Sequence, residues 1–234
     1  LEIINMDEFC DMINTYGGRD KVMKILCYSA KLISGVQIKN NPEMSRKFAI
    51  ISSKISGARA TLRLIDDVPT LQYIMEYGLG EHEHDKTMAA LGVLSNIVDL
   101  FYYPVEKMCW LIEHKVLNVK NPDKWDVISS TFWVSSIWLN LVRTLRNISN
   151  MEDHFICMKK NDKNAEELLE KFMIKQKMEI LSALRLSLDF TYAVNTLPKG
   201  YLWGGKLEVW QAGLIGTLSS VIGIYQYIKK KKMP

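Results

Sequence analysis

Two stretches hold residue types that can bind a metal or carry out acid and base chemistry. The run from His82 to Asp85 reads His-Glu-His-Asp, but its histidines are two positions apart, whereas a zinc-binding helix needs them four apart on one face. The run follows Gly78-Leu79-Gly80, so we interpret it as a solvated loop. Asp66 and Asp67 precede Pro69, and paired carboxylates alone do not make an acid and base couple. We interpret these aspartates as the end of a helix or as partners of nearby arginines.

The chain has four widely spaced cysteines and no Cys-x-x-Cys pair; they are Cys10, Cys27, Cys109 and Cys157. We expect reduced thiols in a protein that faces the cytosol, because neither a disulfide framework nor a zinc site fits this spacing. The sequence also has no glycine-rich phosphate loop and no nucleophile elbow. It therefore predicts a protein that is not an enzyme, with no cofactor and no metal site.

Glycine and proline breakers divide the 234 residues into segments in which apolar side chains recur at spacings of 3 and 4. We predict an all-α, membrane-associated protein with amphipathic helices and one or two transmembrane helices. A mean hydropathy of −0.04 excludes a transporter with many spans. The net charge of +4 by itself suits an anionic membrane surface as well as nucleic acid. We expect a cytosol-facing amphipathic region over 1–124 and a membrane region over 125–234.

The strongest membrane signal lies near the C-terminus, where 20 uncharged residues from Val209 to Ile228 are followed by Lys229, Lys230, Lys231 and Lys232. A helix of this length can cross about 30 Å of hydrocarbon, and the lysines would hold one end at the surface. The alternative is a buried helix, because glutamine, serine and threonine dilute the hydrophobicity. A second stretch, 127–142, has 16 uncharged residues and fits a span, a re-entrant or interfacial helix, or a soluble core helix equally. A helix over 164–195 connects the two stretches.

A third stretch, 46–67, has the pattern of a membrane-bending helix. On a helical wheel its apolar side chains fall within an arc of about 100°, and basic side chains border both edges. We predict that this apolar stripe inserts among acyl chains while the basic side chains reach lipid phosphates. Alternatively, the stripe packs inside the protein's own helical bundle. The predicted contact residues are Lys47, Phe48, Ile51, Lys54, Ile55, Ala58, Arg59, Leu62, Arg63 and Ile65.

Small residues in the C-terminal stretch are spaced for close helix packing. Gly216 with Ser220, and Ser219 with Gly223, form two small-xxx-small pairs, which let helix backbones approach one another. We predict a helix-association face at these four positions. The lysines at 231 and 232 also match a cytosolic dilysine retrieval signal, and we place the lysine tail in the cytosol.

Several short motifs occur in the order found in one known family, from about residue 17 to residue 227. They are Gly18-Arg19-Asp20-Lys21, Leu62 to Asp67, Tyr77 to Gly80, Tyr102-Tyr103-Pro104 with Glu106, Leu197 to Gly200 with Leu202-Trp203, and Gly213 to Ser220 with Tyr225-Gln226. By this order and coverage the chain resembles the peroxin-11 family of peroxisomal membrane proteins, and within it the gamma type. The first residues and the segment between about 147 and 167 lie outside the resemblance.

The resemblance implies a peroxisomal membrane protein with both termini in the cytosol, which remodels the membrane and promotes elongation, proliferation and fission of the organelle. By position, 46–67 corresponds to the amphipathic helix that bends the cytosolic leaflet in this family. We expect anionic membrane lipids as partners and no nucleic acid. The resemblance adds further copies of the chain or other peroxin-11 members, and fission adaptors that recruit a dynamin-like GTPase.

Two alternatives to membrane remodelling stay open. The first is an oligomeric channel for small metabolites, in which Asn140, Thr217, Ser219 and Ser220 would supply polar groups along a path. The second is a soluble helical bundle that acts as an interaction scaffold.

Overall fold

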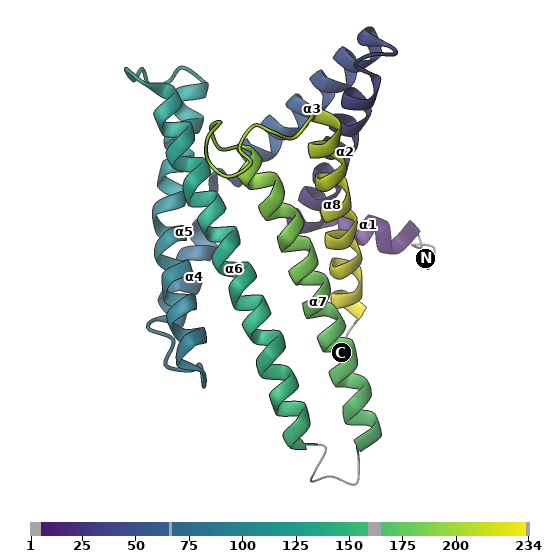
Figure 1. The fold of residues 1–234 in the computed structure, drawn as a ribbon, viewed down its shortest axis with the longest axis vertical. Coiled ribbons are helices and arrows are strands. Elements are labelled where there is room, and N and C mark those ends of the chain that lie inside the picture. The colour runs from purple at the N-terminus through teal and green to yellow at the C-terminus, as the bar shows by residue number, and fades with distance from the viewer. Residues whose placement is uncertain (1–5, 66, 159–164, 233–234) are drawn as a thin grey trace. The chain divides into compact units, whose positions relative to one another are not determined.

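The structure is a computed structural model that describes residues 6–65, 67–158 and 165–232, and these residues form helices and loops with no strand (Figure 1). The prediction of an all-α fold is confirmed. The chain divides into two compact units: unit 1 combines residues 1–65 with 194–234, and unit 2 comprises residues 66–193.

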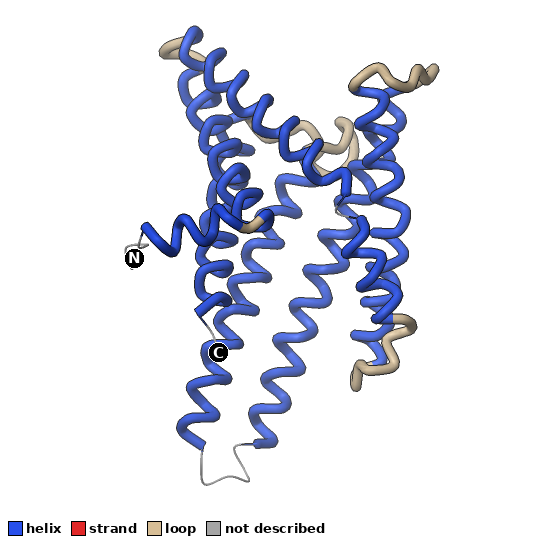
Figure 2. Tube along the Cα trace, turned by 180° about the vertical axis from the view of Figure 1, so that it is seen from behind, coloured by secondary structure: helices blue, strands red, loops and turns tan. Residues whose placement is uncertain are grey.

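Unit 1 is built on the α2 helix (Tyr16–Gln37), which packs against three neighbours: α1 (Met6–Asn14), α3 (Pro42–Leu62) and α8 (Val209–Lys232). Polar side chains cap the starts of two of these helices. Thr15 accepts a hydrogen bond from the Gly18 amide at the start of α2, and Asn41 accepts one from the Met44 amide at the start of α3. A short 3₁₀ turn, η1 (Arg63–Ile65), follows α3. The N-terminal helices and the C-terminal helix α8 therefore belong to one helical unit (Figure 2).

Unit 2 contains α4 (Asp67–Tyr77), α5 (Lys86–Glu113), α6 (Pro122–Met158) and most of α7 (Ala165–Asn195). The α5 and α6 helices run antiparallel: Ser136 donates a hydrogen bond to Asp99 at 2.7 Å, and the rings of Phe101 and Phe132 stack at 6.3 Å. The α7 helix contacts α6 through aromatic rings, with Trp138 lying 5.3 Å from Phe190.

Most buried residues of the two units are small or polar, with a few larger apolar ones such as Met88, Ile137 and Leu141, and many large apolar side chains are exposed. The buried polar residues include Ser34, Ser45, Ser52, Arg59, Ser95, Asn96, Ser219 and Ser220. Large exposed side chains include Leu26, Val36, Ile50, Leu94, Phe101, Leu218 and Val221. A protein that folds in water has the opposite distribution, whereas helices in lipid approach through small residues and turn polar groups toward one another. The fold itself therefore has the packing pattern of a membrane protein.

The structure differs from the sequence predictions in one helix and in the division of the chain into regions. The segment 46–67 is not one helix, because α3 ends at Leu62, the 3₁₀ turn follows, and Asp67 starts α4. Asp67 thus begins a helix rather than ending one, and it pairs with Lys107 rather than with an arginine. The predicted division near residue 125 also differs from the contacts, which join α5 to α6 and the N-terminal helices to α8. Contacts between the N-terminal helices and α8 depend on tertiary packing, and no change in amino-acid composition along the chain marks them.

Candidate membrane-contact surfaces

The α5 helix carries the first candidate surface. Among the described residues it is the one helix long and apolar enough to cross a membrane, and only 22% of its apolar window is buried. Its outer face is formed by Ala90, Leu94, Ile97, Phe101 and Pro104, which are all exposed and recur at spacings of 4 and 3. Phe101 is the most exposed of the large ones, at 57%. A core helix of a soluble protein would bury most of such a window, so this face fits acyl chains.

The opposite face of α5 is polar and buried against its own unit. Ser95 and Asn96 are buried, and Asp99 accepts the hydrogen bond from Ser136 of α6. Gly92 allows close packing here, because a methyl group at this position would lie 2.0 Å from the hydroxyl of Tyr77. Polar groups that face a partner helix and apolar groups that face outward are the arrangement expected for a membrane helix.

The segment that forms α5 was not among the predicted spans, because Asp99, Glu106 and Lys107 interrupt its uncharged run. Average hydropathy over 18 residues is the signal that finds it. By the same measure α8 and the 127–142 stretch of α6 do not qualify as spans. The interpretation of 209–228 as a span therefore stays a prediction without support from this measure.

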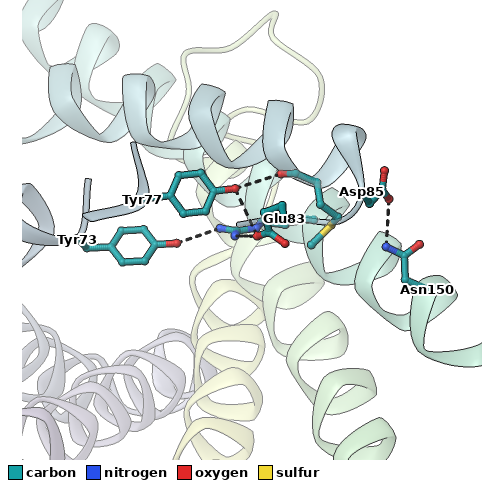
Figure 3. A network of polar contacts seen from close by, with 7 residues as sticks. Tyr73, Tyr77, Glu83, Asp85 and Asn150 are labelled. Carbon is teal, nitrogen blue, oxygen red and sulfur yellow. Dashed lines mark hydrogen bonds and ion pairs between the residues drawn. The ribbon is translucent and has the colours of Figure 1, made fainter. Parts of the chain in front are cut away.

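A polar network lies at the N-terminal end of α5 (Figure 3). Arg143 of α6 donates hydrogen bonds to Glu83 at 2.9 Å and to the hydroxyl of Tyr73 at 3.3 Å. Asp85 caps α5 by accepting the Thr87 amide at 2.8 Å. The predicted loop position of 82–85 agrees with the structure, but its carboxylates hold the loop to α6 and are not simply solvated.

Asp85 is the most strongly bound of these carboxylates. It accepts hydrogen bonds from Arg146 at 2.7 Å and from Asn150 at 3.0 Å. The hydrogen bond from Arg146, supported by those from Asn150 and the Thr87 amide, holds the pKa of Asp85 well below its ordinary value. The Asp85 carboxylate is therefore charged at neutral pH and marks a polar boundary where the apolar part of α5 begins.

The α3 helix carries the second candidate surface. Its Ser45, Ser52 and Arg59, seven residues apart, are buried, and Ser45 and Ser52 contact Ser34 and Cys27 of α2. The apolar stripe lies at the edge of this contact and beyond it: Phe48 and Ile55 are half-buried, and Ala58, Ile51, Leu62 and Ile65 are exposed. Ile51 and Leu62 each keep 46% of their surface exposed. Most of the stripe is thus exposed within unit 1, and its contact with lipid stays a prediction.

The basic residues of this stretch divide into two groups. Lys47 and Lys54 are exposed beside the stripe; Lys47 also forms an exposed ion pair with Glu43. Arg59 is 9% exposed and binds Asp20 of α2, with 2.7 Å between Nε and Oδ1. The prediction that Arg59 contacts lipid is therefore wrong, because its guanidinium is committed to α2. Arg63 lies in the 3₁₀ turn and is half-buried.

The predicted association face on α8 lies mainly against α2. Gly216, Ser219 and Ser220 are buried there, while Gly223 is half-buried. The contact is within one chain; association between chains at this face stays a prediction. The tail lysines continue α8 as far as Lys232, and Lys231 pairs with Asp11 of α1 at 3.0 Å. Three cysteines, Cys10, Cys27 and Cys109, are free thiols, while the side chain of Cys157 lies outside the described residues.

The family model described as Peroxisomal biogenesis factor 11 (PEX11) matches residues 6–228, which is nearly the whole chain. The chain belongs to the peroxisomal biogenesis factor 11 family. It is 31% identical over 222 residues to peroxisomal membrane protein 11C of Homo sapiens, with 92% of this chain and 90% of that protein covered. It is 29% identical over 232 residues to peroxisomal membrane protein 11C of Mus musculus, with 96% and 95% covered. No solved structure matches the chain.

Membership of this family confirms the resemblance found in the sequence motifs and identifies a protein of peroxisome biogenesis. A biogenesis factor has in general a non-enzymatic role. The apolar outer face of α5 fits the membrane location named for both relatives. The candidate site is therefore a set of membrane-contact surfaces.

Proposed function

We propose that the protein resides in the peroxisomal membrane, is anchored by α5, and bends the cytosolic leaflet through α3, so promoting elongation, proliferation and fission of the organelle. The observation that carries the proposal is the orientation of α3. Its serine and arginine face is fixed on α2, and the exposed part of its apolar stripe lies beside Lys47 and Lys54. An apolar wedge in one leaflet expands that leaflet alone, and curvature follows without hydrolysis of a nucleotide.

The exposed α3 face has enough binding energy for a reversible wedge. A fully buried isoleucine or leucine contributes about 1.5–3 kcal/mol, so half-exposed Ile51 and Leu62 have about 1 kcal/mol each left to gain. Lys47 and Lys54 add about 1 kcal/mol each near an anionic leaflet. A sum near 4 kcal/mol suits a helix that inserts while α5 keeps the protein at the membrane.

The packing of unit 1 supports a location of both termini on the same side, which we propose is the cytosol. Helices from residues 6–65 and the helix α8 contact α2 within this unit. The chain must then cross the membrane an even number of times between the two parts of unit 1. If α5 crosses, a second segment of unit 2 must cross as well, and the 127–142 stretch lies antiparallel to α5.

The partners follow from the exposed groups and from the family. Anionic lipids fit the exposed lysines of α3, and the proposal includes further copies of this chain or related family members, together with fission adaptors that recruit a dynamin-like GTPase. The alternative of a metabolite channel gains no support from the polar residues considered for it. Ser219 and Ser220 are buried against α2, and Thr217 and Ser220 donate to carbonyl groups of their own helix.

The test uses the full-length protein reconstituted in anionic vesicles and observed by electron microscopy. The double substitution Ile51→Glu, Leu62→Glu places charge on the stripe, and Lys47→Ala, Lys54→Ala removes its exposed cations. Both are expected to abolish or strongly reduce tubules while the protein stays in the alkaline-carbonate pellet. The control Ser53→Glu adds a charge to an exposed position of α3 outside the stripe and should still form tubules. Normal tubules with Ile51→Glu, Leu62→Glu would refute the proposal.

A further inference from the structure

The loop 196–208, which joins α7 to α8, is compact and is fixed at its base (Figure 1). Asn195 accepts two backbone amides there: its carbonyl oxygen accepts from Gly205 at 3.0 Å, and its side-chain oxygen accepts from Leu207 at 2.9 Å. Gly204 is buried within the loop, where a methyl group on it would lie 2.5 Å from the carbonyl oxygen of Pro198. The loop therefore has a defined shape that holds its tip in place.

The tip of this loop is apolar and exposed. Tyr201 is 62% exposed and Leu202 is 65% exposed, while Trp203 beside them is half-buried. More than half of the surface of both tip side chains thus stays outside the folded chain, and packing within unit 1 does not account for two neighbouring large side chains at this position.

Leu202 also has a backbone conformation that leucine rarely adopts. Its φ of 48° lies in the left-handed region, where the β-carbon of an L-residue is crowded by the backbone. The loop has glycine at its other two positions of positive φ, Gly200 at 111° and Gly205 at 64°. Glycine or asparagine would fit position 202 with less strain if the residue served only the turn. An exposed leucine in a strained conformation therefore indicates a role for its side chain outside the folded chain.

Basic side chains flank the apolar tip. Lys199 lies before it and Lys206 after it, and both are exposed. The one acidic residue of the loop, Glu208, accepts a hydrogen bond from the indole nitrogen of Trp210 at 2.7 Å. An aromatic ring and an aliphatic side chain between two lysines suit the interface of an anionic leaflet, where apolar groups enter the acyl boundary and ammonium groups reach the phosphates.

We infer that this loop is a membrane-contact element whose tip, Tyr201 and Leu202, inserts into the interfacial region of a leaflet. The flanking lysines, Lys199 and Lys206, bind the phosphates of its anionic lipids. The inference rests on the membrane location of the protein and not on bending by α3. It concerns the loop alone and leaves the course of α8 as the sequence predicts it.

Quenching by spin-labelled lipid tests the inference in the full-length protein, reconstituted in vesicles of phosphatidylcholine and phosphatidylserine. The four native cysteines are replaced by serine, Tyr201→Cys introduces one cysteine at the tip, and a fluorescent bimane group is attached to it. We expect phosphatidylcholine with a spin label on its acyl chain to quench this bimane strongly, and less strongly in vesicles without phosphatidylserine. The control Ser53→Cys carries the same bimane at an exposed position of α3 outside its apolar stripe and should be quenched weakly. The spin-labelled lipid is present in both leaflets, so the result does not depend on the side on which the loop lies.

A second variant separates membrane contact from folding. Leu202→Asn places a polar residue that tolerates a left-handed conformation at the strained position, so the Tm in detergent should not fall. The bimane at position 201 should then be quenched only as weakly as the bimane at position 53. Equal quenching at the two positions in the parent protein, or quenching that Leu202→Asn leaves unchanged, overturns the inference. A bimane at position 201 that lipid does not quench, but that becomes shielded at high protein density, would indicate contact with a second copy and would overturn it as well. Tubule formation is measured separately with the α3 substitutions, so failure of one proposal is distinguishable from failure of the other.

Discussion

The ion pair between Arg59 and Asp20 fixes the orientation of α3 on α2, so its removal is the most informative perturbation of unit 1. Arg59 donates two hydrogen bonds to the two carboxylate oxygens, from Nε at 2.7 Å and from Nη2 at 3.2 Å. The arginine side chain is 11% exposed and the aspartate side chain 28% exposed. The substitution Arg59→Met keeps the length of the apolar stem and leaves the Asp20 carboxylate without its partner.

The cost can be estimated from the geometry. Removal of one partner of a fully buried ion pair costs about 3–5 kcal/mol, and a hydrogen bond to a charged group contributes about 1.5–3 kcal/mol. Asp20 keeps some contact with solvent, so the remaining carboxylate is partly solvated. We therefore expect Arg59→Met to lower the free energy of unfolding by about 2–3 kcal/mol, which is a fall of roughly 10 °C in Tm for a unit of about 100 residues.

A double-mutant cycle measures this energy. Arg59→Met, Asp20→Asn and the double variant are unfolded by heat in mild detergent, and helix content is followed by circular dichroism. We expect a coupling energy of about 2 kcal/mol between the two positions. The control Lys47→Met removes an exposed ion pair with Glu43 and should change stability by less than about 1 kcal/mol. If the losses at Arg59 and Asp20 simply add, the two side chains do not interact and the assigned orientation of α3 is wrong.

Two further predictions concern buried polar groups. Burial raises the pKa of Asp20, but the hydrogen bond and the charge of Arg59 more than offset this, so the folded carboxyl has a pKa below 3.8. Its contribution to stability is complete above the unfolded pKa and is lost as pH falls through the lower folded pKa. The stability advantage over Asp20→Asn should therefore shrink in thermal scans as pH falls below 3.8, and an advantage that does not shrink with acid would contradict the assignment. In α5, Asn96 is 7% exposed, and its amide nitrogen finds no acceptor among the described residues. Asn96→Leu should raise Tm, because an unsatisfied buried donor costs about 1–3 kcal/mol, and a lower Tm would show that the amide has a partner.

The local features of the chain could be predicted from the sequence because they depend on neighbouring residues. Apolar spacings of 3 and 4 predicted helices, and the 20-residue uncharged run predicted a helix at Val209, where α8 begins. The apolar and basic stripe on 46–67 was also readable, since a helical wheel needs only the spacing. The end of α3 at Leu62 was missed, because the apolar pattern continues through Ile65 while the backbone changes to a 3₁₀ turn.

The sequence alone did not determine which face of each helix is buried. Lys54 and Arg59 border opposite edges of the apolar stripe, and the spacing alone does not say which edge is buried. Arg59 is buried because Asp20, 39 residues earlier, lies opposite it. Likewise, the sequence of the uncharged stretch 209–228 does not show that it packs against a charged helix. In the structure α2 lies beside it, and Lys24 donates a hydrogen bond to Ser219 near its centre. Residue spacing determines which side chains share a face of a helix. Which face packs against another helix depends on contacts between residues far apart in the chain, and these exist only in the tertiary structure.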